Sequence, residues 1–386
     1  MTRFAFVTWD GGGNLPPAVG IAQGLLAHGH DVVFAGYEVQ RERLEQRRLP
    51  FVALRRTGAF DIYAASDPSQ RIAGLMANVW ASPEHLDDIP DALADTSSDV
   101  LVIDFSMQGA LASADRSVAP VAVLAHSTIT GLTPPPESPM GAARLSATNQ
   151  LRAGARLPQL ARLPEAWTGY PTLVTTIPAL DPAAETADGS VHYLGPIFEA
   201  LPDDPWESPW AAGDNRPLVL VSFSTTGLWE QSSRIRNTLE GLAGEPVRVL
   251  VSAAQSMDLG RIPDNAAIRP FVPHQRVLRD AVLTVTHAGH GTVAASLAHG
   301  VPLVCLPNPA ADQPFLAARV QQLGAGLALD GESGPATIRA AVAEVMSIHS
   351  YAAAAAKLAI AIKEAPGVGG AVVELERLAV PSPAAH

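Results

Sequence analysis

The feature that most constrains the fold is a repeated alternation of short apolar runs with helix-length segments. Residues 3–8 (RFAFVT) are typical of a strand, residues 18–28 carry apolar side chains at helical spacing, and residues 31–35 (DVVFA) follow as a second strand. Further strand-like runs occur at 100–103, 121–124 and 173–177. Strand, helix and strand in this order predict a βαβ unit, and their repetition predicts a parallel sheet covered by helices.

The alternation restarts after a proline-rich stretch without periodicity, residues 195–217. New strand patterns follow at 218–223, 247–251, 268–271, 282–285 and 303–306. The sequence therefore predicts an α/β protein with two Rossmann-like, doubly wound domains facing across a cleft. We expect an N-terminal domain at 1–200, a linker at 201–216 and a C-terminal domain at 217–386, with the final helix packing back on the first domain. Ligands bind at the carboxyl ends of such strands, so we expect the substrates to meet in that cleft.

Composition excludes several classes of protein. The net charge of −12 opposes binding to nucleic acid and to anionic membranes, so any bound nucleotide is expected to be a small molecule. The only cysteine, Cys305, lies in an apolar run, which excludes a disulfide and a cysteine metal site. No secretion signal or membrane-spanning run is recognised, which predicts a cytoplasmic protein. Homodimer formation is left open.

The strongest local motif runs from residue 286 to residue 324 (THAGHGTVAASLAHGVPLVCLPNPAADQPFLAARVQQLG). His287 ends a strand pattern, Gly289 and Gly291 allow close approach of a ligand to the backbone, and a helix pattern follows from Thr292. Helix-start amides, the Thr292 hydroxyl and the His287 ring suit a diphosphate leaving group without a metal. A glycine turn that merely joins a strand to a helix is the structural alternative.

This motif resembles the donor signature of family-one glycosyltransferases of the GT-B fold, in particular the bacterial enzymes that glycosylate natural products such as antibiotics. The resemblance is close over residues 270–324 and looser over the first 40 residues. It implies inverting, metal-independent transfer of a sugar, often a deoxysugar, from a nucleotide diphosphate to a small acceptor. No cofactor is implied, because the nucleotide sugar is a co-substrate.

The resemblance also implies roles for individual residues. The donor would be bound through its nucleobase by Phe271 and Val272, through its diphosphate by His287, Gly289, Gly291 and Thr292, and through its sugar hydroxyls by Asp312 and Gln313. Ser224 and Thr225, after the strand at 218–223, would add hydroxyls to the diphosphate pocket, with ordinary turn chemistry as the alternative. A helix N-cap is the alternative role for Asp312.

One departure from plant-type relatives bears on the nucleotide. Ala295 stands where a glutamate usually binds the ribose hydroxyls. Absence of this glutamate weakens the binding of a deoxyribose nucleotide less than that of a ribose nucleotide. It therefore favours dTDP-sugars over UDP-sugars as the donor.

A second departure concerns the general base that inversion requires. Alignment on Pro17 places Asn14 where the family has a histidine, and asparagine cannot accept a proton. Three replacements are candidates: Asp10, which ends the first strand but could form an Asx turn; Asp104, which matches the carboxylate that orients the family's histidine; and His126, which follows another strand and titrates near neutral pH.

The acceptor is expected to contact the N-terminal glycine loop, at Gly12, Gly13 and Asn14. Two segments that we interpret as loop-rich, residues 55–90 and 130–171, contain large apolar residues, among them Trp80 and Met140. Such residues could line a pocket for an aromatic or polyketide-like acceptor, or form minor core under the loops.

Three other functions compete with this interpretation. A dinucleotide-binding oxidoreductase needs a third glycine where the chain has Pro16, and an acidic residue nearer than Glu38. A nucleotide-sugar epimerase of the same fold would need no acceptor pocket. A non-catalytic, glycosyltransferase-like partner protein is consistent with Asn14.

Overall fold

The computed structural model describes residues 1–380 apart from positions 66, 115, 118, 201–205, 224–230, 254–256 and 310–311. The chain divides into two compact units. Unit 1 comprises Met1–Ala200 together with Pro366–His386, and unit 2 comprises Leu201–Ala365. The chain therefore passes from unit 1 to unit 2 and returns.

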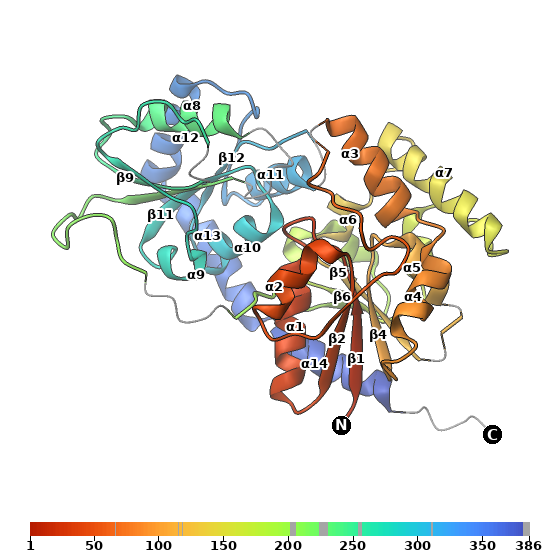
Figure 1. The fold of residues 1–386 in the computed structure, drawn as a ribbon. Coiled ribbons are helices and arrows are strands. Elements are labelled where there is room, and N and C mark those ends of the chain that lie inside the picture. The colour runs from red at the N-terminus through yellow and green to blue at the C-terminus, as the bar shows by residue number, and fades with distance from the viewer. Residues whose placement is uncertain are drawn as a thin grey trace. The chain divides into compact units, whose positions relative to one another are not determined.

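Unit 1 is built on a parallel sheet of seven strands (Figure 1). The order is β3-β2-β1-β4-β5-β6-β7. The strands are β1 Arg3–Val7, β2 Asp31–Gly36, β3 Phe51–Ala53, β4 Val100–Asp104, β5 Val121–Ala125, β6 Thr172–Val174 and β7 Val191–Tyr193. The order reverses between β1 and β4, which makes the carboxyl ends of these strands the expected binding edge of a doubly wound sheet.

The helices of unit 1 correct two expectations. Residues 55–90 and 130–171 are not mainly loop, because both contain helices, and the longest of these is α7 Pro139–Gly154. The α-helices are α1 Leu15–Ala27, α2 Arg41–Glu45, α3 Pro68–Leu75, α4 His85–Leu93, α5 Gln108–Ala114, α6 Ile129–Leu132, α7 and α14 Gly367–Ala379. A π-helical turn, η2 Met76–Trp80, follows α3, and 3₁₀ turns lie at η1 Glu38–Gln40, η3 Leu163–Trp167, η4 Pro178–Leu180 and η5 Pro182–Thr186.

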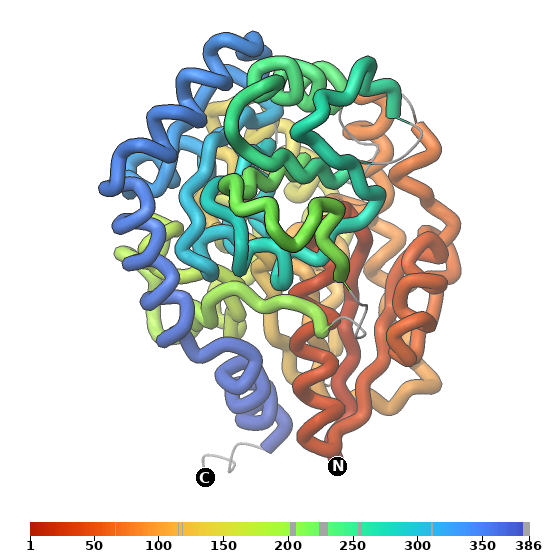
Figure 2. Tube along the Cα trace, turned by 90° about the vertical axis from the view of Figure 1, so that its left-hand side faces the viewer, coloured from red at the N-terminus to blue at the C-terminus, as the bar shows by residue number. Residues whose placement is uncertain are grey.

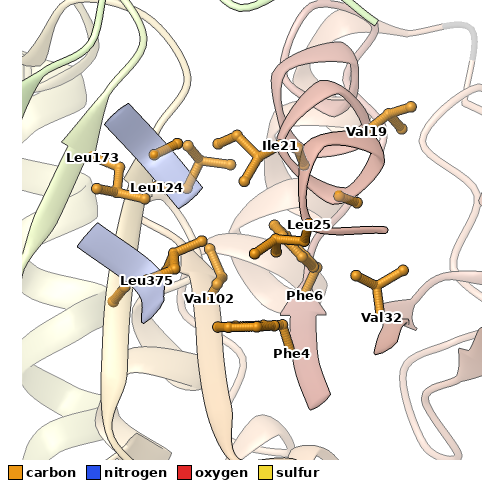
Figure 3. Close-up of a cluster of buried hydrophobic side chains, with 14 of the residues drawn as sticks. Phe4, Phe6, Val19, Ile21, Leu25, Val32, Val102, Leu124, Leu173 and Leu375 are labelled. Carbon is orange, nitrogen blue, oxygen red and sulfur yellow. The ribbon is translucent and has the colours of Figure 1, made fainter. Parts of the chain in front are cut away.

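The last helix, α14, packs into the core of unit 1. Leu375 lies among Phe4, Leu25 and Val102 in the close-up of Figure 3. Figure 2 shows α14 running beside α1. The approach is close at Gly24, where an added Cβ would lie 2.2 Å from Cγ1 of Val368. Burial removes the apolar face of α14 from water and packs this helix against β1.

Unit 2 contains a parallel sheet of six strands in the order β10-β9-β8-β11-β12-β13. The strands are β8 Leu218–Ser222, β9 Arg248–Ser252, β10 Ala266–Arg269, β11 Ala281–Thr286, β12 Leu303–Cys305 and β13 Gly326–Ala328. The helices are α8 Ser232–Leu242, α9 His274–Val277, α10 His290–Ala298, α11 Gln313–Gln322, α12 Pro335–Ser347 and α13 His349–Glu364. The order reverses between β8 and β11, whose last residues, Ser222 and Thr286, are register partners at the binding edge, and His287 follows directly.

The predicted strands are confirmed with small shifts, and three short strands, β3, β7 and β13, had not been predicted. The strand predicted at 268–271 ends earlier, because β10 stops at Arg269 before Pro270. Cys305 is buried in β12, and burial raises the pKa of its thiol to about 12. No single helix in the described residues has the length and apolar composition to cross a bilayer, although the bent pair Pro335–Ser347 and His349–Ala379 passes on these two criteria alone.

Candidate active site

His126 and Asp104 form a hydrogen-bonded pair at the binding edge of unit 1. Their strands, β5 and β4, are neighbours, with Asp104 in register with Leu124. His126 directly follows β5, two residues beyond Leu124. Nδ1 of His126 lies 2.9 Å from Oδ2 of Asp104, and the side chains are 12% and 1% exposed. The sequence named both residues as separate candidates, and the structure brings them together.

The surroundings of Asp104 fix which atoms carry protons. Burial would raise the pKa of this carboxyl group, but His126 and the hydrogen bonds from Ser106 outweigh burial, so the pKa is lowered. An ionised carboxylate only accepts hydrogen bonds, so His126 donates from Nδ1. In a neutral ring this leaves Nε2 as the basic nitrogen.

A chain of hydrogen bonds connects this pair to the glycine loop that follows β1. Nε1 of Trp9 donates to Oγ of Ser106 at 2.9 Å, and that hydroxyl donates to Oδ1 of Asp104 at 2.5 Å. The backbone N–H of Ser106 donates to the same oxygen at 2.9 Å. Sequence reasoning missed Trp9 and Ser106, although the position of Ser106 two residues after Asp104 suits an Asx turn.

Asp10 is engaged in other interactions. Its Oδ1 accepts from the backbone N–H of Gly12 at 2.8 Å, so the expected Asx turn is present. Its Oδ2 lies 3.1 Å from a guanidinium nitrogen of Arg43, which also binds Glu199. A base role for Asp10 would require it to leave this ion pair.

Asn14 holds the glycine loop in shape. Its Oδ1 accepts from the N–H of Gly11 and its Nδ2 donates to the carbonyl of Trp9, both at 2.7 Å. Asn14 is only 3% exposed. Gly12 has a φ of 93°, which disfavours other residues, and Gly13 is exposed. The two glycines and the loop backbone therefore offer more contact surface than the Asn14 side chain.

Two further candidates for acceptor contacts lie on helices of unit 1. Trp80 ends η2 and Met140 lies in the first turn of α7, and both are half-buried. The ring of Trp80 is covered on one side by the guanidinium of Arg144, with 4.9 Å from Cζ to the ring centroid.

The predicted anion site of unit 2 begins with His287 at the end of β11. His287 is 8% exposed, and its pKa is lowered to about 4, mainly by burial and also by the charge of Arg234. The ring is therefore neutral near pH 7. An added Cβ at Gly289 would lie 2.5 Å from Nε2 of His287, so only glycine fits beside this ring.

The turn after His287 determines the direction in which helix α10 begins. Ala288 is buried with a φ of 63°, a conformation that costs a non-glycine residue roughly 1–2 kcal/mol. Gly289 is the N-cap of α10, and Gly291 and Thr292, in the first turn, are at least partly exposed. An accessible helix start beside a neutral histidine suits an anion.

The other donor candidates of unit 2 differ in exposure. Phe271 is 54% exposed after β10, whereas Val272 is 2% exposed and belongs to the core. Oγ of Ser222 lies 2.9 Å from Nε2 of His274, an unpredicted pair that anchors the start of α9 to the end of β8. Ser224 and Thr225 lie outside the described residues.

Asp312 and Gln313 lie together at the start of α11. Oε1 of Gln313 accepts from the backbone and side-chain nitrogens of Asn308, at 3.0 and 2.9 Å, so the amide nitrogen is the group left for other partners. Asp312 occupies the N-cap position, but its side chain makes no capping hydrogen bond. Asp312 therefore stands at the N-cap position, as the alternative expectation had it, but without the capping hydrogen bond.

Arg234 is a buried cation of unit 2 that the sequence did not single out. It lies in the first turn of α8 and is 6% exposed, and its guanidinium pairs at 2.8 Å with Glu332, whose side chain is 75% exposed. An added Cβ at Gly331 would lie 2.9 Å from this guanidinium. Because its charge acts on His287, Arg234 lies near the predicted anion site. No group of three metal-ligating side chains occurs within the described ranges.

Comparison with known proteins agrees with this architecture. The family model described as "Erythromycin biosynthesis protein CIII-like, C-terminal domain" matches residues 236–378. The 4'-demethylrebeccamycin synthase of Lentzea aerocolonigenes is 26% identical over an alignment of 400 positions, which covers 92% of this chain and 94% of the relative.

Two solved structures share the fold. The glycotransferase of kitacinnamycin superposes with a TM-score of 0.79 at 21% identity, over 98% of both chains. The glycosyltransferase VinC in complex with dTDP superposes with a TM-score of 0.73 at 20% identity, over 98% of this chain and 99% of the other. The two parallel-sheet units, the family match and these relatives together show that the chain is a GT-B glycosyltransferase, related to enzymes of antibiotic biosynthesis.

Proposed function

We propose that the protein transfers a sugar, with inversion and without a metal, from a nucleotide diphosphate to a hydroxyl of a small hydrophobic natural product. The observation that carries this proposal is the pair formed by His126 and Asp104. It supplies the general base whose usual position is occupied by Asn14.

In the proposed reaction, Nε2 of His126 removes the proton of the acceptor hydroxyl. The acceptor oxygen forms a bond to the anomeric carbon while the bond from that carbon to the diphosphate oxygen breaks, and the nucleotide diphosphate leaves with the electron pair. Asp104 keeps Nδ1 protonated and stabilises the imidazolium that forms, as a carboxylate does in other catalytic histidine pairs.

On the donor side, we propose that the start of α10 binds the negatively charged diphosphate as it leaves. Amides of the first turn, the Thr292 hydroxyl and His287 would bind the phosphate oxygens. Asp312 and Gln313 would bind the sugar hydroxyls, and the exposed ring of Phe271 would stack on the nucleobase. EDTA is expected to leave the initial rate unchanged, and rate loss restored by a divalent cation would contradict the metal-free assignment.

We further propose dTDP as the nucleotide. Ala295 is 2% exposed on α10 and offers no ligand to a ribose 2′-hydroxyl. VinC, which shares the fold, is in complex with dTDP. Isothermal titration of the full chain with dTDP and UDP tests this point, and tighter binding of UDP would overturn it.

Incubation with dTDP-glucose or UDP-glucose and a panel of phenols, followed by mass spectrometry, tests the main proposal. A glycosylated phenol is the expected product, and the coupling constant of its anomeric proton reports inversion. A changed sugar nucleotide without transfer would indicate the epimerase. Nucleotide binding without either product for any tested acceptor would favour a non-catalytic partner.

A further inference from the structure

Arg144 is a second buried arginine, and its setting differs from that of Arg234. It lies in the middle of α7 in unit 1 and is 7% exposed. Burial lowers the pKa of its guanidinium to about 10, with a smaller opposing effect from Asp104. The side chain therefore carries its charge at neutral pH inside the protein.

Few groups satisfy this guanidinium. Nη1 donates to the carbonyl of Leu132 at 3.0 Å, and the group lies over the ring of Trp80. Within the part of the chain that the structure describes, its Nε has no hydrogen-bond partner and no carboxylate lies within ion-pair distance. The half-buried Arg43 and the buried Arg234 each have such a carboxylate. A buried cation without a bound anion is costly, because it has lost water without gaining an opposite charge.

Neighbours of Arg144 on α7 line a cavity, and a further polar group is buried on the same helix. Gly141 and Leu145, on the same side of α7, line a cavity of about 180 Å³ together with Thr133 and five other residues of unit 1. Thr148, one turn farther along α7, is buried, and its hydroxyl also has no hydrogen-bond partner among described residues. One side of α7 therefore combines a cavity wall with unused hydrogen-bonding groups.

The position of Arg144 relative to the proposed base suggests what it binds. Its charge interacts with Asp104, the partner of His126. Both residues belong to unit 1, so an acceptor that reaches His126 is the ligand on which Arg144 could act. Arginine binds carboxylates through two parallel hydrogen bonds, and Nε with a terminal nitrogen is one suitable edge.

We propose that Arg144 and Trp80 form a subsite for a carboxylate carried by the acceptor. Identification of the ligand as the acceptor rests on the proposed function, whereas the anion subsite itself rests on Arg144 and its surroundings. The substrate class is thus a hydroxy-aromatic carboxylic acid in place of a neutral phenol.

The test compares two fluorescent compounds that differ by one carboxylate, 3-hydroxy-2-naphthoate and 2-naphthol. Titration of the full chain is expected to give a dissociation constant for the naphthoate at least about tenfold lower than for naphthol, the effect of one hydrogen-bonded charge. Arg144→Gln should remove this preference and leave naphthol binding unchanged, and Arg144→Lys should retain part of it. Arg152→Gln is the matched control, because Arg152 lies in the same helix and donates to the carbonyl of Pro158.

Equal binding of the two compounds by the unsubstituted protein would overturn the proposal. So would equal weakening of both by Arg144→Gln, since a purely structural arginine would produce that result. If Arg144→Gln does not fold, Arg144→Lys decides, because full retention of the preference would show that a bidentate arginine is not needed. Binding of the naphthoate without its glycosylation would refute the proposed function alone, and glycosylation of naphthol without naphthoate binding would refute the subsite alone.

Discussion

Replacing Asp104 with asparagine should inactivate the proposed base while preserving the fold around it. Ser106 dictates how the new amide must lie. Its hydroxyl accepts from Trp9 and therefore donates to position 104, and its N–H donates to the same oxygen. Only the amide oxygen can accept both bonds, so the amide nitrogen must face His126. That nitrogen donates to Nδ1, which moves the ring proton to Nε2 and removes the lone pair that would accept a proton from the acceptor.

The expected loss in kcat follows from this change of tautomer. A positioned general base contributes about 10²–10⁴-fold, or roughly 3–5 kcal/mol of barrier, and loss of the orienting carboxylate in a serine protease costs about 10⁴-fold. We expect Asp104→Asn to lower kcat about 10³-fold, with KM for the donor unchanged. Stability should fall by roughly 1–1.5 kcal/mol, because the hydrogen bond between position 104 and His126 is no longer charge-assisted.

Initial rates with the donor that supports turnover, measured for 2-naphthol and 4-nitrophenol, provide the assay. The loss should be smaller for 4-nitrophenol, because a more acidic hydroxyl needs less help from a base. Asp99→Asn is the control at the other end of β4, where Asp99 accepts from the backbone N–H of Arg3, and it should leave kcat unchanged. A kcat for Asp104→Asn above about a tenth of the unsubstituted value would refute this reasoning.

Three further results are expected. Gly289→Ala should weaken dTDP binding at least about tenfold, because the methyl group would displace the His287 ring; calorimetry that shows unchanged affinity would contradict the proposed anion site. Arg234→Gln should weaken dTDP binding, because this buried cation lies near the predicted anion site; unchanged affinity in the same calorimetry would argue against this role. Stability should fall on acidification, because burial lowers the pKa of His85 to about 4 from an unfolded value of 6.5: its contribution is complete above pH 6.5 and is lost toward pH 4, by about 1.4 kcal/mol per pH unit. Urea unfolding at several pH values should show a shallower slope for His85→Gln, and an unchanged slope would contradict this assignment.

The strand pattern and the turn from His287 into α10 could be predicted from the sequence because they depend on local features. Continuous apolar runs identify buried parallel strands, and the order of glycines after His287 sets the turn into α10. The helices within 55–90 and 130–171 were missed because their patterns are weak. Helix α4 contains Pro90, and α7 mixes small and polar residues along its length.

The pairing of His126 with Asp104 could not be predicted, because it depends on which strands are neighbours and in what register. Each residue taken alone was only a plausible base. The same limit applies to Arg234 and Arg144, whose burial arises from contacts between distant segments. An isolated arginine in a helix pattern more often lies at the surface.

The return of α14 to the first strand has a consequence for synthesis of the protein on the ribosome. Unit 2 is one uninterrupted stretch of chain, so all of it has been made before residue 366 is joined. Part of the core of unit 1 therefore stays exposed until Ala371, Val372 and Leu375 have been synthesised and can pack against it. A stop codon after residue 365 would therefore leave unit 1, which is made first, incomplete and prone to aggregation. Unit 2 would keep all of its strands.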